Sequence, residues 1–251
     1  MNKEKEISIN ADIKKRVEWI KALIKQSGAK GIVFGNSGGK DCSLAGILSK
    51  LATDNVTGII MPCEAKRNFL ADRDDALLIA KQYDIEVIEI DLTPIKLAFR
   101  NQLREHVDVQ NTMAYANINP RLRMTTLYAY AYDKNYLVLG TGNRSEITMG
   151  YFTKYGDGGY DFNPISDLTA TEIYEYLEVL KAPEEIIKKA PSAGLFEGQT
   201  DEKEMGITYK DLDKFILTGE GSEDTKKLVN AVFNRTKHKR QPPVTYPNGI
   251  N

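Results

Sequence analysis

Apolar residues recur at helical spacing near the start of the chain. Ile13, Val17, Ile20 and Ile24 lie three or four residues apart, and Gly28 follows them as a stop signal. This spacing places their side chains on one face of a helix. We therefore predict an amphipathic helix that ends close to residue 28.

Some short apolar runs have a different pattern, because they are continuous and are bounded by glycine, proline or polar residues. These runs cover residues 31–34, 56–61, 86–90 and 136–139. Continuous apolar runs of this length are typical of parallel strands that are buried on both faces. We expect each run to form one strand of a parallel sheet.

Helical patterns separate these runs and continue after the last one. The predicted helices cover about 44–51, 70–83, 120–134, 169–180 and 223–238. Thr93 and Pro94 have the residue types of an N-cap and a first helical position. Strands that alternate with helices predict an α/β fold, with a doubly wound, mostly parallel sheet and helices on both faces.

The sequence contains nothing that divides it into separate units. Residues 151–164 have no clear period, and no Pro/Ser-rich linker is present, so we expect a single domain over residues 1–251. Open parallel sheets bind ligands outside the carboxyl ends of their strands. We therefore expect the chemistry in the loops that follow the first and fourth predicted strands.

Composition narrows the possible functions. The chain has 34 Lys and Arg against 35 Asp and Glu, a net charge of -1 that does not favour nucleic-acid or membrane binding. Two cysteines and two histidines exclude a disulfide scaffold and a zinc site made of four cysteines. The N-terminus lacks the apolar segment of a signal peptide, and no run is long enough to cross a membrane. We expect a cytoplasmic protein.

A glycine-rich turn follows the first predicted strand and precedes a helix. It reads GNSGGKDCS and comprises Gly35, Asn36, Ser37, Gly38, Gly39, Lys40, Asp41, Cys42 and Ser43. Backbone N–H groups of such a turn and the positive end of a helix dipole together bind oxyanions. The spacing is one residue too short for a Walker A loop, and Asp41 stands where that loop has Ser or Thr.

The string SGGxD[S/C] in this turn resembles the pyrophosphate loop of the ATP pyrophosphatases, whose fold is adenine-nucleotide α-hydrolase-like. The alternative is an ordinary Gly-rich turn in which Asp41 caps a helix. The motif alone does not separate the members of that family, which include synthetases of asparagine, GMP or a deazaguanine base and tRNA-thiolating enzymes.

Longer strings later in the chain resemble the NAD synthetase family, in the order that the family has them. They are GTGNRSE at 140–146, GYFTKYGDGG at 150–159, DFNPI at 161–165, PSAGL at 191–195, GQTDE at 198–202 and TKHKR at 236–240, followed by two prolines. The resemblance extends from about residue 12 to 245. It implies an ammonia-dependent ligase that amidates deamido-NAD and consumes ATP.

The resemblance assigns ligands to individual residues. ATP would contact residues 35–42 of the glycine-rich turn, together with Thr141 and Ser192. Mg²⁺ would lie on Asp41 and Glu146. Deamido-NAD would be bound by Arg121, Lys154, Asp161, His238 and Lys239, and in a homodimer it would lie across the subunit boundary. Without the resemblance, the same residues are surface arginines, loop charges and cations at a helix C-terminus.

The implied reaction needs no covalent nucleophile. The nicotinate carboxylate attacks the α-phosphate of ATP and releases pyrophosphate, and ammonia then displaces AMP from the acyl-adenylate. Cys42 lies at a helix N-terminus, which lowers a thiol pKa, but no histidine partner can be named for it. Residues before the glycine-rich turn are too few for a glutaminase domain, although a separate chain could deliver ammonia.

One position departs from the family pattern. The family has a lysine that contacts ATP phosphate where this chain has Ala170. We consider Lys40 in the glycine-rich turn as its substitute, or else Lys188 or Lys189 from the following predicted helix. If none of them replaces it, ATP is held less tightly.

Two other functions compete with this interpretation. A tRNA-modifying ATP pyrophosphatase would have a basic surface or added cysteine pairs, which the net charge and the lack of a CxxC pair oppose. A regulator that had lost catalysis would lack a metal carboxylate, whereas Asp41 and Glu146 are both present.

Overall fold

The computed structural model describes residues 2–64, 69–108, 112–189 and 201–246. Its strands are β1 (Gly31–Gly35), β2 (Val56–Ile60), β3 (Glu86–Glu89) and β4 (Tyr136–Val138). They form one sheet in the order β3-β2-β1-β4, and all three pairs of neighbours are parallel. The predicted strands and their parallel pairing are confirmed.

The strand order places a reversal beside β1. The chain moves outward from β1 to β2 and β3, and then returns to add β4 on the other side, where Val33 pairs with Val138. A bridge between Leu139 and Phe162 continues this edge beyond β4. The loops that follow β1 and β4 therefore meet at the carboxyl end of the sheet, where open α/β sheets bind their ligands.

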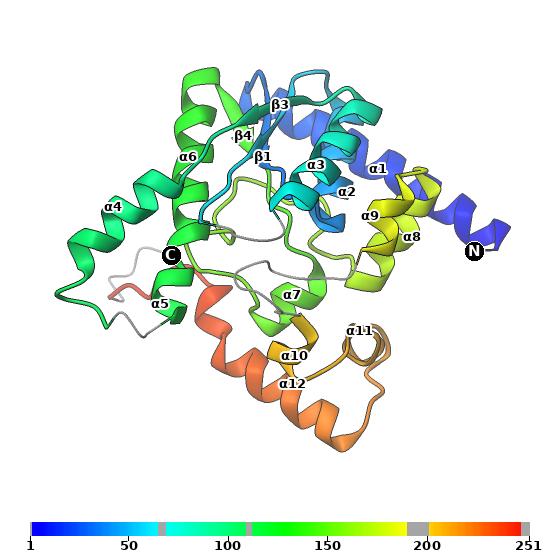
Figure 1. Ribbon diagram of the computed structural model, residues 1–251. Helices are drawn as coiled ribbons and strands as arrows, with labels where there is room; N and C mark the ends of the chain where they lie inside the picture. The colour runs from blue at the N-terminus through cyan, green and yellow to red at the C-terminus, as the bar shows by residue number, and fades with distance from the viewer. Residues whose placement is uncertain (1, 65–68, 109–111, 190–200, 247–251) are drawn as a thin grey trace.

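One face of the sheet is covered by α1 (Lys3–Ser27), α2 (Lys40–Ala52), α3 (Phe69–Tyr83) and α8 (Ala170–Val179) (Figure 1). Their apolar faces share one core with β1 and β2. The fully buried side chains of this core include Ile20, Ile32, Phe34, Leu44, Ile47, Ile79 and Leu177. Removal of such side chains from water supplies the main favourable term in folding.

The opposite face is packed by α6 (Ile118–Lys134), which lies against β1 and β4. Val33 and Val138 of the strands meet Leu127 and Ala131 of the helix in a second core. Helices on both faces are therefore confirmed, and α6 begins two residues before the predicted start at residue 120.

The remaining helices lie around the carboxyl end of the sheet and below it in Figure 1. They are α4 (Thr93–Leu103), α5 (Thr112–Ala116), α7 (Arg144–Met149), α9 (Glu184–Lys188), α10 (Asp201–Met205), α11 (Tyr209–Thr218) and α12 (Glu223–Arg235), with a 3-10 turn at Lys237–Lys239. Met149, Leu212 and Val229 form a third core that joins α7, α11 and α12.

Among the predicted boundaries that differ from the structure, two concern helix ends near α4 and α12. Thr93 is the first residue of α4 rather than its N-cap, because its hydroxyl accepts a hydrogen bond from Glu64 N at 2.9 Å. The helix predicted over 223–238 ends at Arg235, and the chain tightens into a 3-10 turn. At the start of α4, a contact from outside the helix engages the hydroxyl that would cap it, whereas at the end of α12 the Thr236 hydroxyl donates to Val232 O within the helix.

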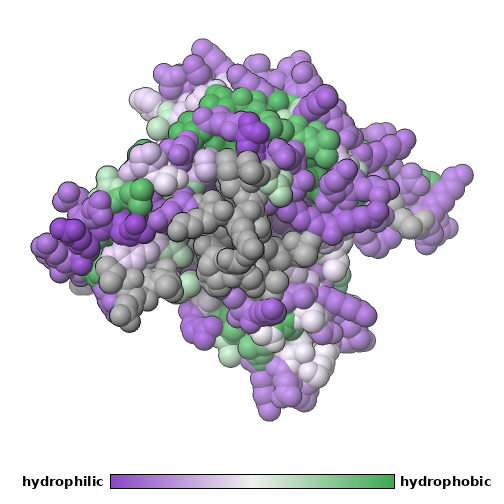
Figure 2. Space-filling model, viewed as in Figure 1, coloured by the Kyte–Doolittle hydropathy of each residue, from purple (hydrophilic) through white to green (hydrophobic). Residues whose placement is uncertain are grey.

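The surface in Figure 2 is mostly hydrophilic, with an apolar area over the strands at the top of the view. Within the four described stretches, no helix has both the length and the apolar character needed to cross a membrane.

Candidate active site

The glycine-rich turn connects β1 to α2 at the carboxyl end of the sheet. Asn36 is buried and donates its amide to Ala76 O at 3.2 Å, which ties the turn to α3. Gly38 has a φ of +68°, and a Cβ there would lie 2.2 Å from Asp72 O. A side chain at this position would be strained and would also displace α3. The turn is therefore fixed in shape by its neighbours.

Gly39 is the N-cap of α2, and no side chain of the described residues caps this helix end. N–H groups in the first turn of a helix can bind an anion, so the predicted anion site at this turn stays a prediction that this geometry allows. The Cys42 thiol donates to Gly39 O at 3.2 Å and lies 3.3 Å from Ser37 Oγ. These contacts and its burial make Cys42 part of the packing of the turn.

The two carboxylates proposed to bind metal are joined by Asn143. Its side-chain amide donates to Asp41 Oδ1 at 3.0 Å, and its backbone N–H donates to Glu146 Oε2, also at 3.0 Å. Asn143 is the N-cap of α7, and Glu146 completes a capping box with it. The structure therefore brings Asp41 and Glu146, which are far apart in sequence, to one place.

Lys40 lies in the same cluster and is almost fully buried. Its ammonium contacts Asp41 Oδ2 at 2.6 Å and lies 5.7 and 5.6 Å from the ring centroids of Tyr174 and Tyr209. Burial by itself would lower the pKa of Lys40, but attraction to Asp41 and Glu146 outweighs it and raises the pKa. The side chain is therefore a permanent cation beside both carboxylates.

A third carboxylate supports the cluster from α11. Asp213 is buried, accepts the hydroxyl of Ser145 and the backbone N–H of Thr171 at 2.8 Å, and is attracted to Lys40. Ser145 Oγ in turn accepts the N–H of Ala170 at 3.1 Å. Burial raises the pKa of Asp213, and the hydrogen bond from Ser145 opposes this rise. Asp213 thus links α7, α8 and α11.

The oxygen atoms of Asp41 and Glu146 fit Mg²⁺ better than a metal ion whose ligands all come from protein side chains. In the part of the chain that the structure describes, no group of three or more His, Cys, Asp and Glu side chains could hold a metal. Asp41 and Glu146 supply hard oxygen atoms from two directions. Mg²⁺ commonly binds through one or two carboxylates and completes its shell with phosphate oxygens and water.

Three of the residues predicted to bind the dinucleotide lie together. Arg121 donates to Lys154 O at 3.5 Å, and Lys154 Nζ donates to His238 O at 2.8 Å. They come from α6, the loop after α7 and the 3-10 turn. Arg121 and Lys154 are therefore two cations at one place on the surface, which suits a phosphate-containing ligand.

Lys239 and Asp161 have partners within the protein. Lys239 Nζ donates to Gly150 O and Phe152 O, both at 2.7 Å, and burial lowers its pKa. Asp161 accepts the N–H of Val138 at 2.8 Å and the hydroxyl of Tyr128 at 3.0 Å. Burial and the Asp161 carboxylate raise the pKa of Tyr128 to about 12, so its hydroxyl stays protonated and remains a donor.

Tyr128 also shows how Asp161 lies with respect to the group formed by Arg121, Lys154 and His238, called the Arg121 group below. It lies seven residues after Arg121 on α6, which is two helical turns or about 10 Å along the same face. Asp161 and the Arg121 group therefore lie along one helix face.

The other predicted ATP contacts are only partly placed. Thr141 is half-buried in the loop that follows β4, on the same edge as the glycine-rich turn. Ser192 lies outside the described residues. Lys188 pairs with Glu184 on the surface of α9, whereas Lys189 contacts Asp72, Asp75 and, at 3.4 Å, Gly38 O. Of these two lysines, Lys189 is therefore the one beside the turn.

Sequence reasoning missed several residues of the site. Asn143 had a local signal, since Asn followed three positions later by Glu is a capping-box pattern. Tyr174, Tyr209 and Asp213 had none, because they converge on Lys40 only through the packing of α8 and α11. Arg123 on α6 donates from Nε to Met61 O at 3.1 Å, just after the end of β2, and is also not among the predicted residues.

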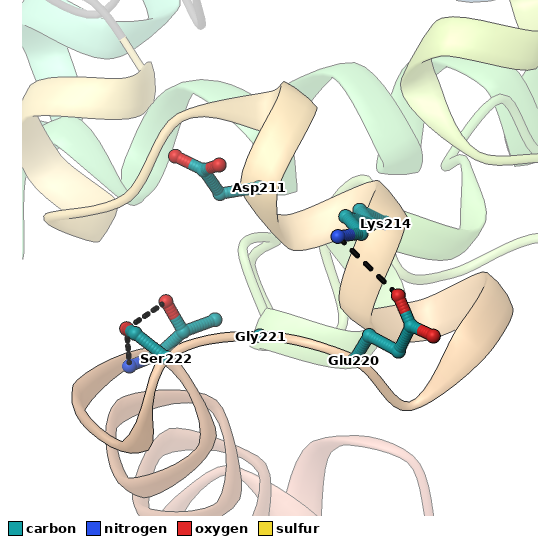
Figure 3. A pocket seen from close by; sticks show the side chains of 6 residues that line it. Asp211, Lys214, Glu220, Gly221 and Ser222 are labelled. Atoms are coloured by element: carbon teal, nitrogen blue, oxygen red, sulfur yellow. Dashed lines mark hydrogen bonds and ion pairs between the residues drawn. The ribbon is translucent and has the colours of Figure 1, made fainter.

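A surface pocket of about 390 Å³ lies elsewhere, between α11 and α12 (Figure 3). Asp211, Lys214, Glu220 and Ser222 are among its lining residues, and Lys214 pairs with Glu220 at 3.3 Å. No predicted site residue lines this pocket. It does not form part of the candidate active site.

The model of the NAD synthase family matches residues 12–243. The chain belongs to the NAD synthase family. It is therefore a ligase that forms carbon–nitrogen bonds, and its membership confirms the resemblance seen in the sequence.

Similar proteins agree with this assignment. An NH₃-dependent NAD⁺ synthetase from Carboxydothermus hydrogenoformans is 46% identical over 91% of this chain and 94% of its own length. Another from Archaeoglobus fulgidus is 42% identical over 90% of this chain and 93% of its own length. Both of these synthetases thus match this chain over nearly all of their length.

Solved structures show the same fold. An NMN synthetase from Francisella tularensis has a TM-score of 0.90 and 35% identity, and the match covers 95% of this chain and 98% of that one. An NH₃-dependent NAD synthetase from Campylobacter jejuni has a TM-score of 0.78 and 29% identity, with the same coverage.

Proposed function

We propose that this chain catalyses the ATP-dependent amidation of deamido-NAD with ammonia, through an acyl-adenylate, with release of pyrophosphate and AMP. The observation that carries the proposal is the joining of Asp41 and Glu146 by Asn143 beside an uncapped helix N-terminus. Carboxylate oxygens suited to a cation would then lie beside N–H donors suited to a polyphosphate, which supports the proposal. NH₃-dependent relatives support ammonia as the nitrogen source.

The chain's own residues would act by positioning and by electrostatics. N–H groups of the turn from Ser37 to Asp41 and the Lys40 ammonium would hold the phosphates of ATP. Charge that develops on phosphate oxygens as pyrophosphate leaves would be stabilised by these fixed donors, which need no reorganisation during the reaction. Mg²⁺, held by Asp41 and Glu146, would supply further neutralisation of that charge.

We propose that the dinucleotide lies along α6, between Asp161 and the group formed by Arg121, Lys154 and His238. Lys239, whose Nζ donates to Gly150 O and Phe152 O, would fix the loop that carries Lys154. A homodimer that places the dinucleotide across its boundary is part of this proposal. Exposed apolar side chains on α4 and α5, namely Ile95, Phe99 and Met113, support an interface on this side of the molecule.

The assay that tests the function combines ATP, Mg²⁺, deamido-NAD and ammonium, with the NAD product measured by a coupled dehydrogenase. We expect NAD formation with ammonium and none with glutamine alone. Turnover of glutamine at a comparable rate would contradict the proposed nitrogen source. Light scattering of the same protein in solution would test the homodimer.

A second substrate is favoured by one observation. The TM-score of 0.90 belongs to a protein described as an NMN synthetase, whereas the Campylobacter NAD synthetase reaches 0.78. We therefore propose deamido-NMN as the alternative acyl donor, which lacks the AMP half of the dinucleotide. Equal concentrations of the two substrates in one reaction would give the ratio of their kcat/KM values. A ratio in favour of the mononucleotide would overturn the choice of deamido-NAD.

A further inference from the structure

Lys40 and Asp41 are neighbours in the first turn of α2, and their side chains are paired with each other. The Lys40 ammonium contacts Asp41 Oδ2 at 2.6 Å, and the Asn143 amide contacts Asp41 Oδ1 at 3.0 Å. Both oxygens of this carboxylate therefore already have a donor. Each carboxylate oxygen can accept more than one partner. A divalent cation at Oδ2 would nevertheless lie next to the ammonium, and repulsion between the two positive charges favours departure of Lys40 from Asp41.

Besides Asp41, other groups around Lys40 also attract its positive charge. The rings of Tyr174 and Tyr209 are both within cation–π distance of the ammonium, and Asp213 attracts it from α11. A buried ammonium needs a compensating anion, because its desolvation is expensive. If Lys40 leaves Asp41, the other carboxylates near it are engaged elsewhere, since Asp213 accepts from Ser145 and Thr171 and Glu146 would share the metal. A further anion would therefore stabilise the displaced ammonium.

The uncapped N-terminus of α2 is where such an anion would bind. Lys40 is the first residue of that helix, so its ammonium is tethered next to the N–H groups that the helix offers to phosphate. A polyphosphate at this place would provide the new partner for Lys40. Its arrival would at the same time release Asp41 Oδ2 for a metal ion.

We propose that Lys40 is an exchangeable countercation, which pairs with Asp41 before ATP binds and moves to the polyphosphate when Mg²⁺ takes Asp41. Lys40 thereby makes the binding of metal and of ATP depend on each other, and acts as a positioning residue for the metal ligand. This inference rests on the proposed function, in which Asp41 and Glu146 bind Mg²⁺ and α2 binds ATP.

The proposal has a reciprocal consequence. If Lys40 couples the two ligands, a variant protein with a neutral residue at position 40 must bind metal alone more tightly than wild type and ATP alone more weakly. Coupling between two sites typically changes an affinity about 5- to 150-fold. General damage to the site would instead weaken both affinities, so the direction of change separates coupling from a structural role.

Mn²⁺ is a suitable probe, because free Mn²⁺ is counted directly by electron paramagnetic resonance. We would titrate wild-type protein, Lys40→Met, Lys40→Arg and Asp41→Asn, each with and without a nonhydrolysable ATP analogue. Lys40→Met retains the apolar stem of the side chain. If this variant does not fold, Lys40→Gln is used in its place. Thermal unfolding monitors the fold of every variant.

Lys189→Met is the matched control. Lys189 also lies beside the glycine-rich turn, with Nζ 3.4 Å from Gly38 O, but its carboxylate partners are Asp72 and Asp75 at 2.7 and 2.6 Å. Its removal takes away one positive charge near the turn without freeing Asp41. Because it also releases Asp72 and Asp75, the control measures the combined effect of lost positive charge and of freed carboxylates near the turn other than Asp41.

Without the analogue, we expect Lys40→Met to bind Mn²⁺ at least tenfold more tightly than wild type, while Lys40→Arg and Lys189→Met stay within about threefold. We also expect metal-free analogue to bind Lys40→Met more weakly. Equal Mn²⁺ affinity in Lys40→Met and wild type would overturn the exchange, provided that Asp41→Asn loses Mn²⁺. If Asp41→Asn and wild type bind Mn²⁺ equally tightly when the analogue is present, the proposed metal site itself is wrong.

Discussion

At the scale of single residues, Asp41 and Glu146 are the side chains on which activity depends most in the proposed mechanism. Asn143 holds one oxygen of each, so both carboxylates are oriented before any ligand binds. We predict that Asp41→Asn and Glu146→Gln each lower kcat by roughly 10²–10³, the usual cost of losing one preorganised electrostatic partner. Steady-state rates over a range of Mg²⁺ concentrations measure this effect.

The exposed Asp133→Asn is the control for these two variants, because its side chain is 72% exposed and pairs only with its neighbour Lys134 among the described residues. Circular dichroism would verify that the fold is retained. If either site variant keeps a near wild-type rate at limiting Mg²⁺, that residue does not bind the metal.

The departure at Ala170 also belongs to this scale. Ala170 is buried at the start of α8, and its N–H donates to Ser145, which in turn donates to Asp213, the carboxylate that attracts Lys40. A lysine–phosphate hydrogen bond contributes roughly 1.5–3 kcal/mol, so its loss weakens binding about tenfold or more. We predict that Lys40→Ala raises the KM for ATP, measured at saturating deamido-NAD.

The double variant Lys40→Ala/Ala170→Lys tests whether the two positions are interchangeable. We expect it to recover part of the ATP affinity, because the alanine at position 40 leaves room for the new lysine. An unchanged KM for ATP in Lys40→Ala would remove Lys40 as the substitute. Lys189, which lies beside Gly38, would then be the next residue to replace.

Local sequence could predict the glycine-rich turn between a strand and a helix, and it could single out Asp41 and Glu146 as candidate metal ligands, because each belongs to a contiguous string. It could not predict the surroundings of Lys40. Tyr174, Tyr209 and Asp213 come from helices that meet only in the folded chain. Their spacing in sequence does not predict that they surround Lys40. Ser192 was predicted as an ATP contact, and it stays a prediction.

At the scale of elements, one ion pair fastens α1 to the loop before α8. Arg16 donates to Asp167 through two nitrogens, at 2.6 and 2.7 Å, and to Pro164 O at 2.5 Å. The Arg16 guanidinium holds the pKa of Asp167 below its ordinary value. For an acid with a lowered pKa, the added stability is present above the unfolded pKa and disappears as pH falls through the folded one.

We therefore predict that Asp167→Asn lowers the free energy of unfolding at neutral pH, and that the difference from wild type vanishes in acid. Because the Asp167 side chain is 65% exposed, solvent screening limits the effect to about 0.5–1 kcal/mol. Urea unfolding at pH 7 and at pH 3 measures it. A difference that persists unchanged at pH 3 would show that the ion pair is not its cause.

Elements were the most predictable level of this fold. Each predicted strand matched one in the sheet, because apolar runs bounded by glycine or proline leave little choice of conformation. Helix ends were less predictable. Thr93 has the residue type of an N-cap, yet its hydroxyl is taken by Glu64 N from the loop after β2, a contact that no local pattern encodes.

At the scale of the whole molecule, the nitrogen source determines how the rate depends on pH. Only neutral NH₃ has the lone pair that can attack the acyl-adenylate. We predict that the rate at fixed, subsaturating total ammonium rises from neutral to mildly alkaline pH, in step with the neutral fraction. Rates at saturating ammonium serve as the control, because there the profile reports the enzyme's own groups. A flat subsaturating profile would count against direct use of free ammonia.

The place of β4 beside β1 also has a consequence for how the chain folds. Tyr136 pairs with Gly31 across roughly 100 residues of intervening chain, and such distant pairings form late because loop closure must precede them. Asp41 and Glu146 follow these two strands, so they meet only after the last strand has docked. A partly folded chain would have no assembled metal site, and binding of Mg²⁺ and ATP would therefore stabilise only the completed fold.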